Sequence, residues 1–314
     1  MSLLSELPAP PIGKVGWPWS IETTRISPKD DQRAWPRISI VTPSYNQAPF
    51  LEETIRSVLL QNYPNLEFVV ADGGSDDGSV EIIKKYDRWI SRWSSGPDGG
   101  QASALNKAFP TTTGEILNWL NSDDLLLPGA LFTIAELFSL DSNVDMISAA
   151  RLLRSAKSGV EQVCLPALDR WPMILAGFPL LPQETTFFKR RIWAAIGSLD
   201  TTLNYTFDVI FYSAALRESR RVVLSEATVG VMQVHTSQKT LQANAESERN
   251  KKLAHALIIS HLSGVRRILA RLYFTRLFVL ADIVQRVFFH AAAKRKFVIG
   301  AYDWSQDQWE LTSF

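Results

Sequence analysis

The stretch "RISIVTPSYNQAPFLEETIRSVLLQNYPNLEFVVADGG", residues 37–74, decides the fold class. It begins with the apolar run "RISIVTP" and ends with "LEFVVADGG", and both runs have the nearly continuous apolar character of buried parallel strands. Between them, "PFLEETIRSVLLQN" carries Leu51, Ile55, Val58 and Leu59 at helical spacing. A strand, a helix and a second strand in this order predict a βαβ unit.

The same alternation continues along the chain to about residue 241. "SVEIIKKYDRWI" (79–90) and "GQASALNKAF" (100–109) predict helices, and "EILNWL" (115–120) predicts another strand. We therefore predict an α/β fold with an open, mainly parallel sheet flanked by helices. Ligands of such sheets bind beyond the carboxyl ends of the strands, where the acidic loops "ADGGSDDGS" and "NSDD" fall.

The composition divides the chain into three regions. Residues 1–36 are rich in Pro and Trp without a sustained period, which predicts an irregular N-terminal extension. Residues 37–241 form the predicted α/β domain. Residues 242–314 are predicted to form a basic, helical C-terminal region.

The helical part of the C-terminal region is rich in Lys and Arg. Between residues 249 and 296 basic side chains recur throughout, and Asp282 is the only acid. A membrane-spanning helix is disfavoured because Arg276, Asp282 and Arg286 would each cost about 2.5 to 3.5 kcal/mol near the bilayer centre. Two interpretations remain open: helices packed on the body with solvated basic ends, or peripheral contact with an anionic membrane.

Charge and cysteine content exclude several classes of function. A net charge of +1 gives no electrostatic support for a nucleic-acid partner, so none is expected. The single cysteine, Cys164, cannot form an internal disulfide or a thiolate metal cluster. The first residues lack the basic start and apolar core of a signal peptide, so a cytoplasmic location is expected.

Two adjacent acids, Asp123 and Asp124, follow the strand predicted at residues 115–120. Neighbouring carboxylates on a loop offer hard oxygen ligands that suit Mg²⁺ or Mn²⁺ and leave positions open for phosphate oxygens. The alternative is that they cap a helix beginning near Pro128. Because the sequence contains no Walker-type loop and no G-x-G-x-x-G fingerprint, these acids must carry the argument for a nucleotide site.

Five blocks of the chain, in order, resemble those of family 2 glycosyltransferases with the GT-A fold, of the bacterial surface-polysaccharide type. The likeness covers about residues 37–240 and rests on "ISIVTPSYNQAPFLEETIRSVLLQNYPNLEFVVADGGSDDGSVEIIKKY", "GPDGGQASALNKAF", "TGEILNWLNSDDLLLPGAL", "PQETTFFKRRIWAAIGSLD" and "TFDVIFYSAAL". It implies a Rossmann-like nucleotide-binding half and an acceptor half, followed by the C-terminal helical extension.

The resemblance also implies which residues contact the donor. These are Pro43, Tyr45 and Asn46 of "TPSYN", Asp72 of "ADGGSDDGS", Asp98, Gly100, Gln101 and Asn106 of the second block, Asp123 of "NSDD", and Lys239. An ungapped match places Asp72 on the first acid of the family's second loop and Gly73 on its second acid. Gly73 therefore departs from the family's pattern beside the nucleotide base.

The remaining implied roles concern the metal, the acceptor and the proton. The resemblance implies Asp124 and His235 as ligands of Mn²⁺ or Mg²⁺, and Gln183 and Glu184 as an acceptor-side wall. Asp208 falls on the family's general base, while Ile210 replaces a second acid found there. An Asp within about 3 Å of the acceptor hydroxyl could take its proton during attack.

The function implied is an inverting, metal-dependent transfer of a sugar from a nucleotide-diphosphate donor to an acceptor hydroxyl. The acceptor would be a glycan or a lipid-linked sugar, met at the cytosolic face of a membrane if residues 249–296 bind lipid. Two alternatives remain open. One is a nucleotidyltransferase acting on a sugar phosphate, which would release pyrophosphate, and the other is a catalytically inactive, membrane-recruited scaffold.

Overall fold

The structure is a computed structural model that describes residues 2–27, 34–155, 161–166, 181–238, 245–260, 299–303 and 308–312. Its helices are α1 (Leu3–Glu6), α2 (Ala48–Leu59), α3 (Ser79–Lys85), α4 (Gln101–Ala108), α5 (Ala130–Ser139), α7 (Arg190–Ile196), α8 (Phe207–Glu218) and α9 (Ala245–Ser260), with short 3₁₀ turns η1 (Phe109–Thr111) and η2 (Gln183–Thr185). Its strands are β1 (Ile38–Ser44), β2 (Leu66–Asp72), β3 (Arg92–Ser95), β4 (Ile116–Trp119), β5 (Leu125–Leu126), β6 (Val144–Ser155), β7 (Glu161–Cys164), β8 (Thr186–Lys189), β9 (Arg221–Val234), β10 (Ile299–Asp303) and β11 (Gln308–Thr312).

A central mixed sheet organises the described residues. Its strand order is β3-β2-β1-β4-β8-β6-β9-β5, and β7 pairs with β6 outside this path. The first four strands are mutually parallel, whereas β8 joins β4 and β6 in antiparallel pairing. The parallel half therefore brings the carboxyl ends of β1, β2 and β4 to one edge of the sheet.

The βαβ unit predicted from residues 37–74 is confirmed by β1, α2 and β2. The two strands are parallel, with Ile38 opposite Leu66 and Ser44 opposite Asp72. All seven residues of β1 are buried, as expected for a central strand covered on both faces. At the start of α2, the carboxylate of Asp77 accepts a hydrogen bond from the backbone N–H of Ala48 at 2.8 Å and so caps the helix.

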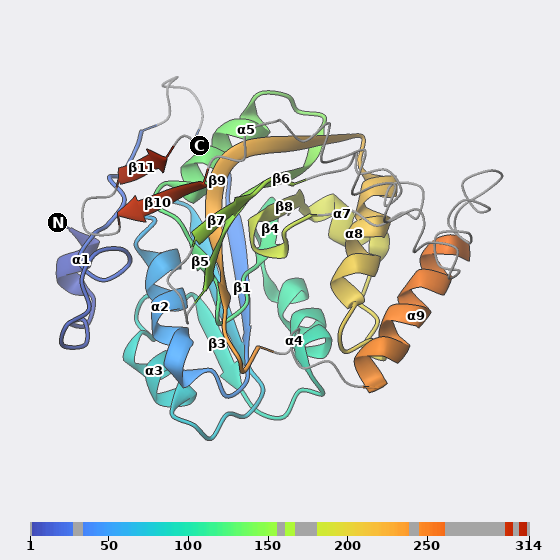
Figure 1. The fold of residues 1–314 in the computed structure, drawn as a ribbon, viewed down its shortest axis with the longest axis horizontal. Helices are drawn as coiled ribbons and strands as arrows, with labels where there is room; N and C mark the ends of the chain where they lie inside the picture. Colours follow the sequence, from blue (N-terminus) through green and yellow to red (C-terminus); the bar gives the residue numbers. More distant parts are fainter. Residues whose placement is uncertain are drawn as a thin grey trace.

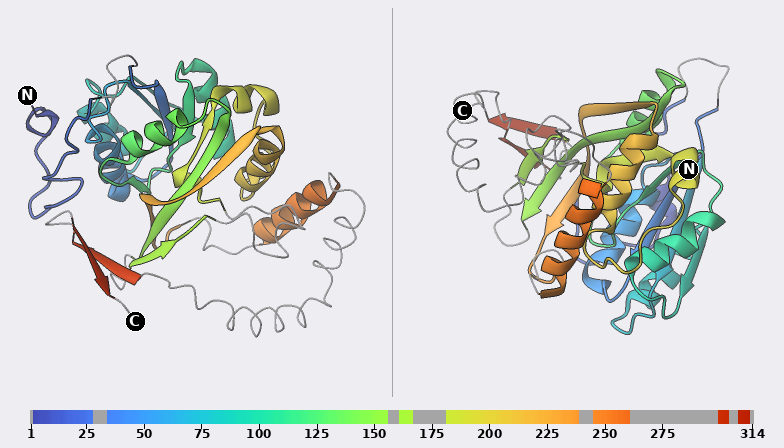
Figure 2. Two further views of the ribbon diagram at one scale, coloured as in Figure 1. Left: turned by 90° about the horizontal axis from the view of Figure 1, so that it is seen from above. Right: turned by 90° about the vertical axis from the view of Figure 1, so that its right-hand side faces the viewer.

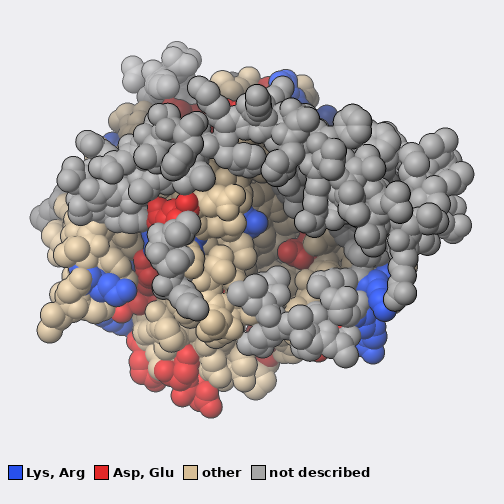
Figure 3. Space-filling view, in the orientation of Figure 1, with Lys and Arg blue, Asp and Glu red and all other residues tan. Residues whose placement is uncertain are grey.

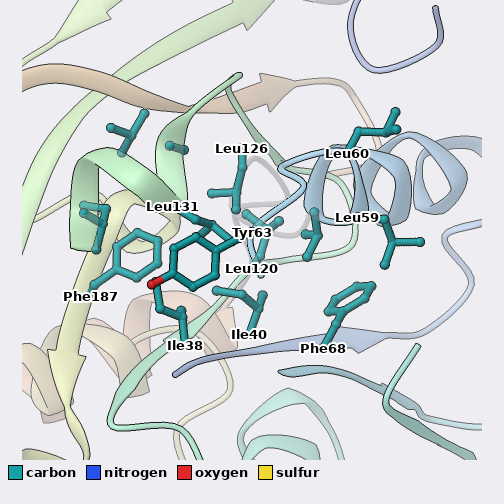
Figure 4. Close-up of a cluster of buried hydrophobic side chains, with 14 of the residues drawn as sticks. Ile38, Ile40, Leu59, Leu60, Tyr63, Phe68, Leu120, Leu126, Leu131 and Phe187 are labelled. Carbon is teal, nitrogen blue, oxygen red and sulfur yellow. The ribbon is translucent and has the colours of Figure 1, made fainter. Parts of the chain in front are cut away.

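Helices cover both faces of the sheet and create two apolar cores. Helices α2, α3 and α5 pack on one face, and α4, α7 and α8 pack on the other (Figure 1). Figure 4 shows part of the first core, where Ile38 and Ile40 of β1 meet Phe68 of β2 and Leu59 of α2. The second core is dominated by stacked and edge-on aromatic rings around Trp119, at the end of β4.

The N-terminal segment packs on the first core through a buried arginine of α2. The Arg56 guanidinium donates hydrogen bonds to the carbonyl oxygens of Pro8, Pro18 and Trp19, at 2.8 to 2.9 Å. Trp17 adds a hydrogen bond from its indole N–H to the carbonyl of Leu126 at 2.8 Å. These contacts bind residues 2–27 to the α/β body.

Replacing Arg56 with Met is expected to lower the free energy of unfolding by about 2 to 4 kcal/mol, because several buried carbonyl groups lose their donor. The N-terminal segment should also become more sensitive to proteolysis, because these hydrogen bonds hold it. Urea unfolding and limited proteolysis would measure both effects. Arg88→Met is the control, because Arg88 is exposed, and equal stability of the two variants would contradict the anchoring role.

A second buried charge lies at the far end of the sheet. The Asp145 side chain of β6 is fully buried and receives hydrogen bonds from Arg191 Nε at 2.6 Å and from the backbone N–H of Arg220 at 2.7 Å. Burial alone would raise the pKa of Asp145, but the hydrogen bonds and charges of both arginines outweigh it and hold that pKa well below its usual range.

Asp145→Asn is expected to destabilise the fold by about 1 to 3 kcal/mol at pH 7, since two arginines lose a charged acceptor. The pKa of this carboxyl is lowered on folding, so its contribution is complete above the unfolded value of about 3.9 and is lost as pH falls. The difference between the two proteins in urea unfolding should therefore shrink below about pH 4. Asp141→Asn, which alters a partly exposed acid that also pairs with an arginine, is the control. A difference that stays constant with pH would contradict this assignment.

Two sequence predictions differ from the structure. The helix predicted for 79–90 ends at Lys85, because the chain then turns, with Tyr86 and Ile90 buried against the core. The region 242–314 was predicted to be helical. It begins with α9, but β10 and β11 form an antiparallel hairpin with Tyr302 opposite Trp309. Ile299, Tyr302, Trp309 and Thr312 are β-branched or aromatic residues, which favour strands.

The rest of the basic C-terminal region lies outside the described residues. Residues 261–298, which hold most of the segment predicted to contact a membrane, are among those not described. Figure 2 shows α9 beside α8 and the β10–β11 hairpin on the side of β7. On the face drawn in Figure 3, the Lys and Arg side chains of the described residues lie in small separate groups.

Candidate active site

The candidate active site lies at the carboxyl ends of β1, β2 and β4, as predicted for an open α/β sheet. After β4, the chain turns so that the backbone N–H of Asp124 donates to the carbonyl of Asn121 at 3.1 Å. The Thr54 hydroxyl of α2 lies 2.9 Å from the carbonyl oxygens of Ser122 and Asp124. The βαβ unit therefore fixes the loop that carries both acids.

Asp124 is the most buried acid of this loop, with 2% of its surface exposed. Its carboxylate accepts hydrogen bonds from the backbone N–H of Gln233 and from the side-chain amide of Asn121, both at 3.3 Å. Both distances are long for hydrogen bonds to a charged group. Asp124 therefore faces a site with weak protein partners, and the alternative prediction of a helix-capping side chain has no such contact in its favour.

The charges around Asp124 are unbalanced. Burial, followed by the negative charges of Asp123 and Glu184, raises the pKa of Asp124 well above its usual range. Burial also raises the pKa of Glu184, although Arg151 of β6 opposes this from 3.4 Å. Three carboxyl groups thus share the site with one arginine, and a cation would relieve their repulsion.

His235 reaches the site from the end of β9. Its Nε2 lies 3.1 Å from Asp123 Oδ2, and its Nδ1 lies 2.8 Å from the hydroxyl of Ser237. The ring stacks on Phe50 of α2, with 4.1 Å between ring centroids. The structure therefore pairs His235 with Asp123, whereas the sequence resemblance grouped it with Asp124 as a metal ligand.

The described residues do not enclose a metal ion by themselves. No group of three His, Cys, Asp or Glu side chains in the described ranges is arranged to hold one. A hard divalent cation at Asp124 would therefore complete its shell with phosphate oxygens and water, as Mg²⁺ commonly does. The carboxylate donor set and its excess negative charge fit such an ion.

The donor-side loops are held together by hydrogen bonds. Asn46 links them, because its backbone N–H donates to the Ser75 hydroxyl at 2.8 Å while its side-chain oxygen accepts from the N–H of Asp76 at 3.1 Å. Pro43 is buried in β1, and Tyr45 stands out from the loop with 62% of its surface exposed. An exposed ring at this edge is available for stacking on a ligand.

In the second donor-side block, Gln101 contacts the site, whereas Asn106 has a structural role. Gln101, at the start of α4, donates a hydrogen bond to the side-chain oxygen of Asn121 at 2.7 Å and so reaches the Asp123–Asp124 loop. Gly100 precedes it with a φ of 106°, which favours glycine. Asn106 is occupied elsewhere, because its amide accepts from and donates to the backbone of Leu199 at 2.7 and 2.9 Å. The structure therefore gives Asn106 a structural partner in place of a donor contact.

The residues expected on the acceptor side lie in η2 and at the start of α8. Gln183 donates to the carbonyl of Trp119, and the Tyr212 hydroxyl lies 3.4 Å from the carbonyl of Gln183. Asp208 is one helical turn before Tyr212 in α8, and burial together with the charges of Asp208 and Glu184 raises the pKa of Tyr212. Tyr212 therefore lies between Asp208 of α8, whose charge acts on it, and Gln183 of η2, whose carbonyl its hydroxyl contacts. Lys239, also expected near the diphosphate, lies outside the described residues.

Sequence reasoning missed several polar groups of this site, including Asn121, Arg151 and Gln233. Arg151 and Gln233 come from the long strands β6 and β9, and no short motif marks them. Several buried polar atoms of the described residues also lack a hydrogen-bond partner: Thr42 Oγ1, Ser44 Oγ, Gln183 Oε1 and Gln233 Nε2. Unpartnered buried groups at the strand ends are consistent with a site that binds a polar ligand.

Comparisons with known proteins agree with this architecture. Residues 39–192 match the family described as Glycosyl transferase family 2. An uncharacterized glycosyltransferase of Rickettsia typhi is 30% identical over 225 residues, which cover 69% of this chain and 70% of that protein. The putative teichuronic acid biosynthesis glycosyltransferase TuaG of Bacillus subtilis is 36% identical over 92 residues, covering 28% of this chain and 36% of TuaG.

A solved structure shows the same fold. Residues 1–349 of S. aureus TarS, in complex with UDP-GlcNAc, superpose with a TM-score of 0.59 at 19% identity, covering 77% of this chain and 74% of that one. The sheet order, the strand-end site and the relative from Rickettsia typhi support one assignment. The chain belongs to glycosyltransferase family 2 and is a glycosyltransferase with the GT-A fold.

Proposed function

We propose that this glycosyltransferase is inverting and metal-dependent, and that it moves a sugar from a nucleotide-diphosphate donor to an acceptor hydroxyl. One observation carries the proposal: buried Asp124 lies beside Asp123 and Glu184 at the strand ends, and Arg151 is the basic group that opposes them there. The complex of TarS with UDP-GlcNAc gives a donor of this class for a protein of the same fold.

The metal site would centre on Asp124. Mn²⁺ or Mg²⁺, when bound, would neutralise negative charge on the departing diphosphate. Asp123 lies beside it and is oriented by His235 Nε2 at 3.1 Å, so it is placed to accept a hydrogen bond from the donor ribose or sugar. In this proposal His235 acts on the donor through Asp123. Metal ligation by its ring would require that Nε2 leave Asp123 or that Nδ1 leave the Ser237 hydroxyl.

The proton chemistry is assigned to Asp208. Its carboxylate takes the proton of the acceptor hydroxyl while that oxygen forms a bond to the anomeric carbon. The bond to the nucleoside diphosphate breaks on the opposite face, so a single displacement inverts the configuration. Fixed positions for both substrates would supply much of the acceleration.

The acceptor is proposed to be a glycan or a lipid-linked sugar. The support is the likeness to TuaG, whose name assigns it to teichuronic acid biosynthesis. No helix within the described residues is long and apolar enough to cross a bilayer. Peripheral contact with an anionic membrane through residues 249–296 stays a proposal, and vesicle co-sedimentation of the full chain would test it.

Product analysis of the full chain tests the proposed function. The chain is incubated with UDP- and GDP-sugars and with candidate acceptors, in Mn²⁺, in Mg²⁺ and in EDTA. Sugar transfer with release of a nucleoside diphosphate, abolished by EDTA, is expected. Release of pyrophosphate would indicate nucleotidyl transfer instead. Donor-induced thermal stabilisation measures binding independently of turnover, because a ligand that binds only the folded state raises Tm.

A further inference from the structure

The carboxylate at the end of β2 is engaged by its own loop. Asp72, at the end of β2, is buried and accepts hydrogen bonds from the backbone N–H groups of Gly74 and Ser75 and from the hydroxyls of Ser75 and Ser95, at 2.5 to 3.0 Å. Three of these bonds reach Oδ2 and one reaches Oδ1, and only 3% of the residue is exposed. The Asp72 carboxylate is therefore engaged in holding the loop in shape.

Gly73 leaves a space that two other side chains occupy. A Cβ atom at Gly73 would lie 3.2 Å from Asp98 Oδ2 and 3.3 Å from Tyr45 Cδ2, closer than most real Cβ contacts. The carboxylate of Asp98 and the ring of Tyr45 therefore close over Gly73 from two different loops. The Asp98 carboxylate therefore lies beside position 73, where the family's pattern has an acid and this chain has glycine.

The loop of Asp98 is fixed to the end of β2. The backbone N–H of Gly96 donates to the carbonyl of Asp72 at 3.0 Å, and the Ser95 hydroxyl donates to its carboxylate at 2.6 Å. Asp98 Oδ1 accepts the N–H of Gly100 at 2.7 Å, whereas its Oδ2 has no hydrogen-bond partner among the described residues. One acceptor atom of Asp98 is therefore both positioned and available.

We infer that Asp98 Oδ2 reads the nucleobase of the donor while the base stacks on Tyr45; this inference rests on the proposed function. The exposed Tyr45 ring supplies a stacking face. A carboxylate only accepts hydrogen bonds, so it favours bases with a ring N–H at the pairing edge, namely uracil, thymine and guanine. At that ring position adenine and cytosine present an acceptor instead, and their donors at this edge are exocyclic amino groups. They are therefore disfavoured where Oδ2 faces the ring position.

The preference can be measured as dissociation constants for UDP, dTDP, GDP, ADP and CDP. Calorimetry on the full chain, with and without Mn²⁺, separates base recognition from diphosphate and metal binding. The wild-type chain is expected to bind at least one of UDP, dTDP and GDP more tightly than ADP and CDP. Asp98→Asn should weaken that preferred nucleotide by about 10- to 100-fold, because an amide NH₂ meets the base N–H, while ADP and CDP change little.

Asp76→Asn is the matched control, because Asp76 is an exposed acid of the same loop as Gly73. It removes the same charge and should leave every dissociation constant unchanged. Gly73→Ala is a second variant that presses on Asp98 and Tyr45 without changing charge, and it should weaken the preferred nucleotide as well.

The outcomes separate this inference from the proposed function. If the wild-type chain prefers ADP or CDP, or if Asp98→Asn keeps the base preference of the wild type, the assignment to Asp98 is wrong while nucleotide-sugar transfer stands. If the folded wild-type chain binds no nucleoside diphosphate, the proposed function is overturned and the assignment to Asp98 with it. Asp98→Asn retains an acceptor for the Gly100 N–H, and thermal unfolding without ligand checks that it folds.

Discussion

Replacing Asp124 with Asn is expected to reduce sugar transfer by about 10²- to 10⁴-fold, the loss that removal of a metal's charge stabilisation would cause. Asparagine has nearly the same shape and retains one oxygen toward the N–H of Gln233, so the loop should keep its conformation. The missing charge should also remove the extra thermal stabilisation that Mn²⁺ gives to the donor complex. Transfer assays and melting curves with the donor, with and without Mn²⁺, would measure both.

The thermal stability of Asp124→Asn without metal is expected to change in the opposite direction to its activity. Burial and the charges of Asp123 and Glu184 raise the pKa of Asp124 in the folded chain. A carboxyl whose pKa is raised on folding destabilises the fold at pH values above its unfolded value of about 3.9. Asp124→Asn removes this cost, so at pH 7 in EDTA the variant should melt at the same temperature as the wild type or higher.

Loss of activity together with lower metal-free stability would instead indicate general damage to the loop. Asp141→Asn removes an acid that lies on the surface after α5 and contacts Arg221, so transfer should be unchanged in this control. An Asp124→Asn variant that keeps its activity and its response to Mn²⁺ would exclude Asp124 as the metal ligand.

Asp208→Asn should have an effect of similar size on a different step. Removal of a general base typically costs about 10²- to 10⁴-fold in rate, and Asp208 is proposed to act on the acceptor and not on the donor. The dissociation constant of the donor should therefore stay unchanged while kcat falls. Single-turnover transfer assays and calorimetry with the donor would separate the two quantities.

Glu218→Gln is the control for this variant, because Glu218 is an exposed acid in the last turn of the same helix. It should retain full transfer. If Asp208→Asn also retains full transfer and Glu184→Gln does not, the proton acceptor is Glu184, whose carboxyl is buried with a raised pKa. Equal weakening of donor binding and turnover by Asp208→Asn would point to a structural role for Asp208.

Local sequence patterns predicted the elements of the donor half because those elements follow local rules. The apolar runs ending at Ser44 and Asp72 are strands buried on both faces, and the helical spacing between them is α2. Where an element depends on the partner it meets, the prediction failed. The helix starting at Ser79 stops at Lys85 because the chain must turn to place β3 beside β2.

The candidate site shows the same division. The position of Asp123 and Asp124 at a strand end could be predicted, because parallel strands bring their carboxyl ends to one edge. The hydrogen bond that the Asp72 carboxylate accepts from Ser95 could not be predicted, because Ser95 belongs to a neighbouring strand. The ion pair between Arg151 and Glu184 could not be predicted either, because β6 and η2 come together only when the sheet folds.

The sequence by itself determined the α/β class, the order of the elements and the two acidic loops, since each depends on residues close together in the chain. Tertiary structure decided which carboxylates are free. It adds a hydrogen bond from Ser95 to Asp72, directs His235 to Asp123, and leaves Asp98 Oδ2 open beside Gly73. The physical reason is that a carboxylate's availability depends on the polar groups that reach it, and groups such as Ser95 and His235 come from elements distant in sequence.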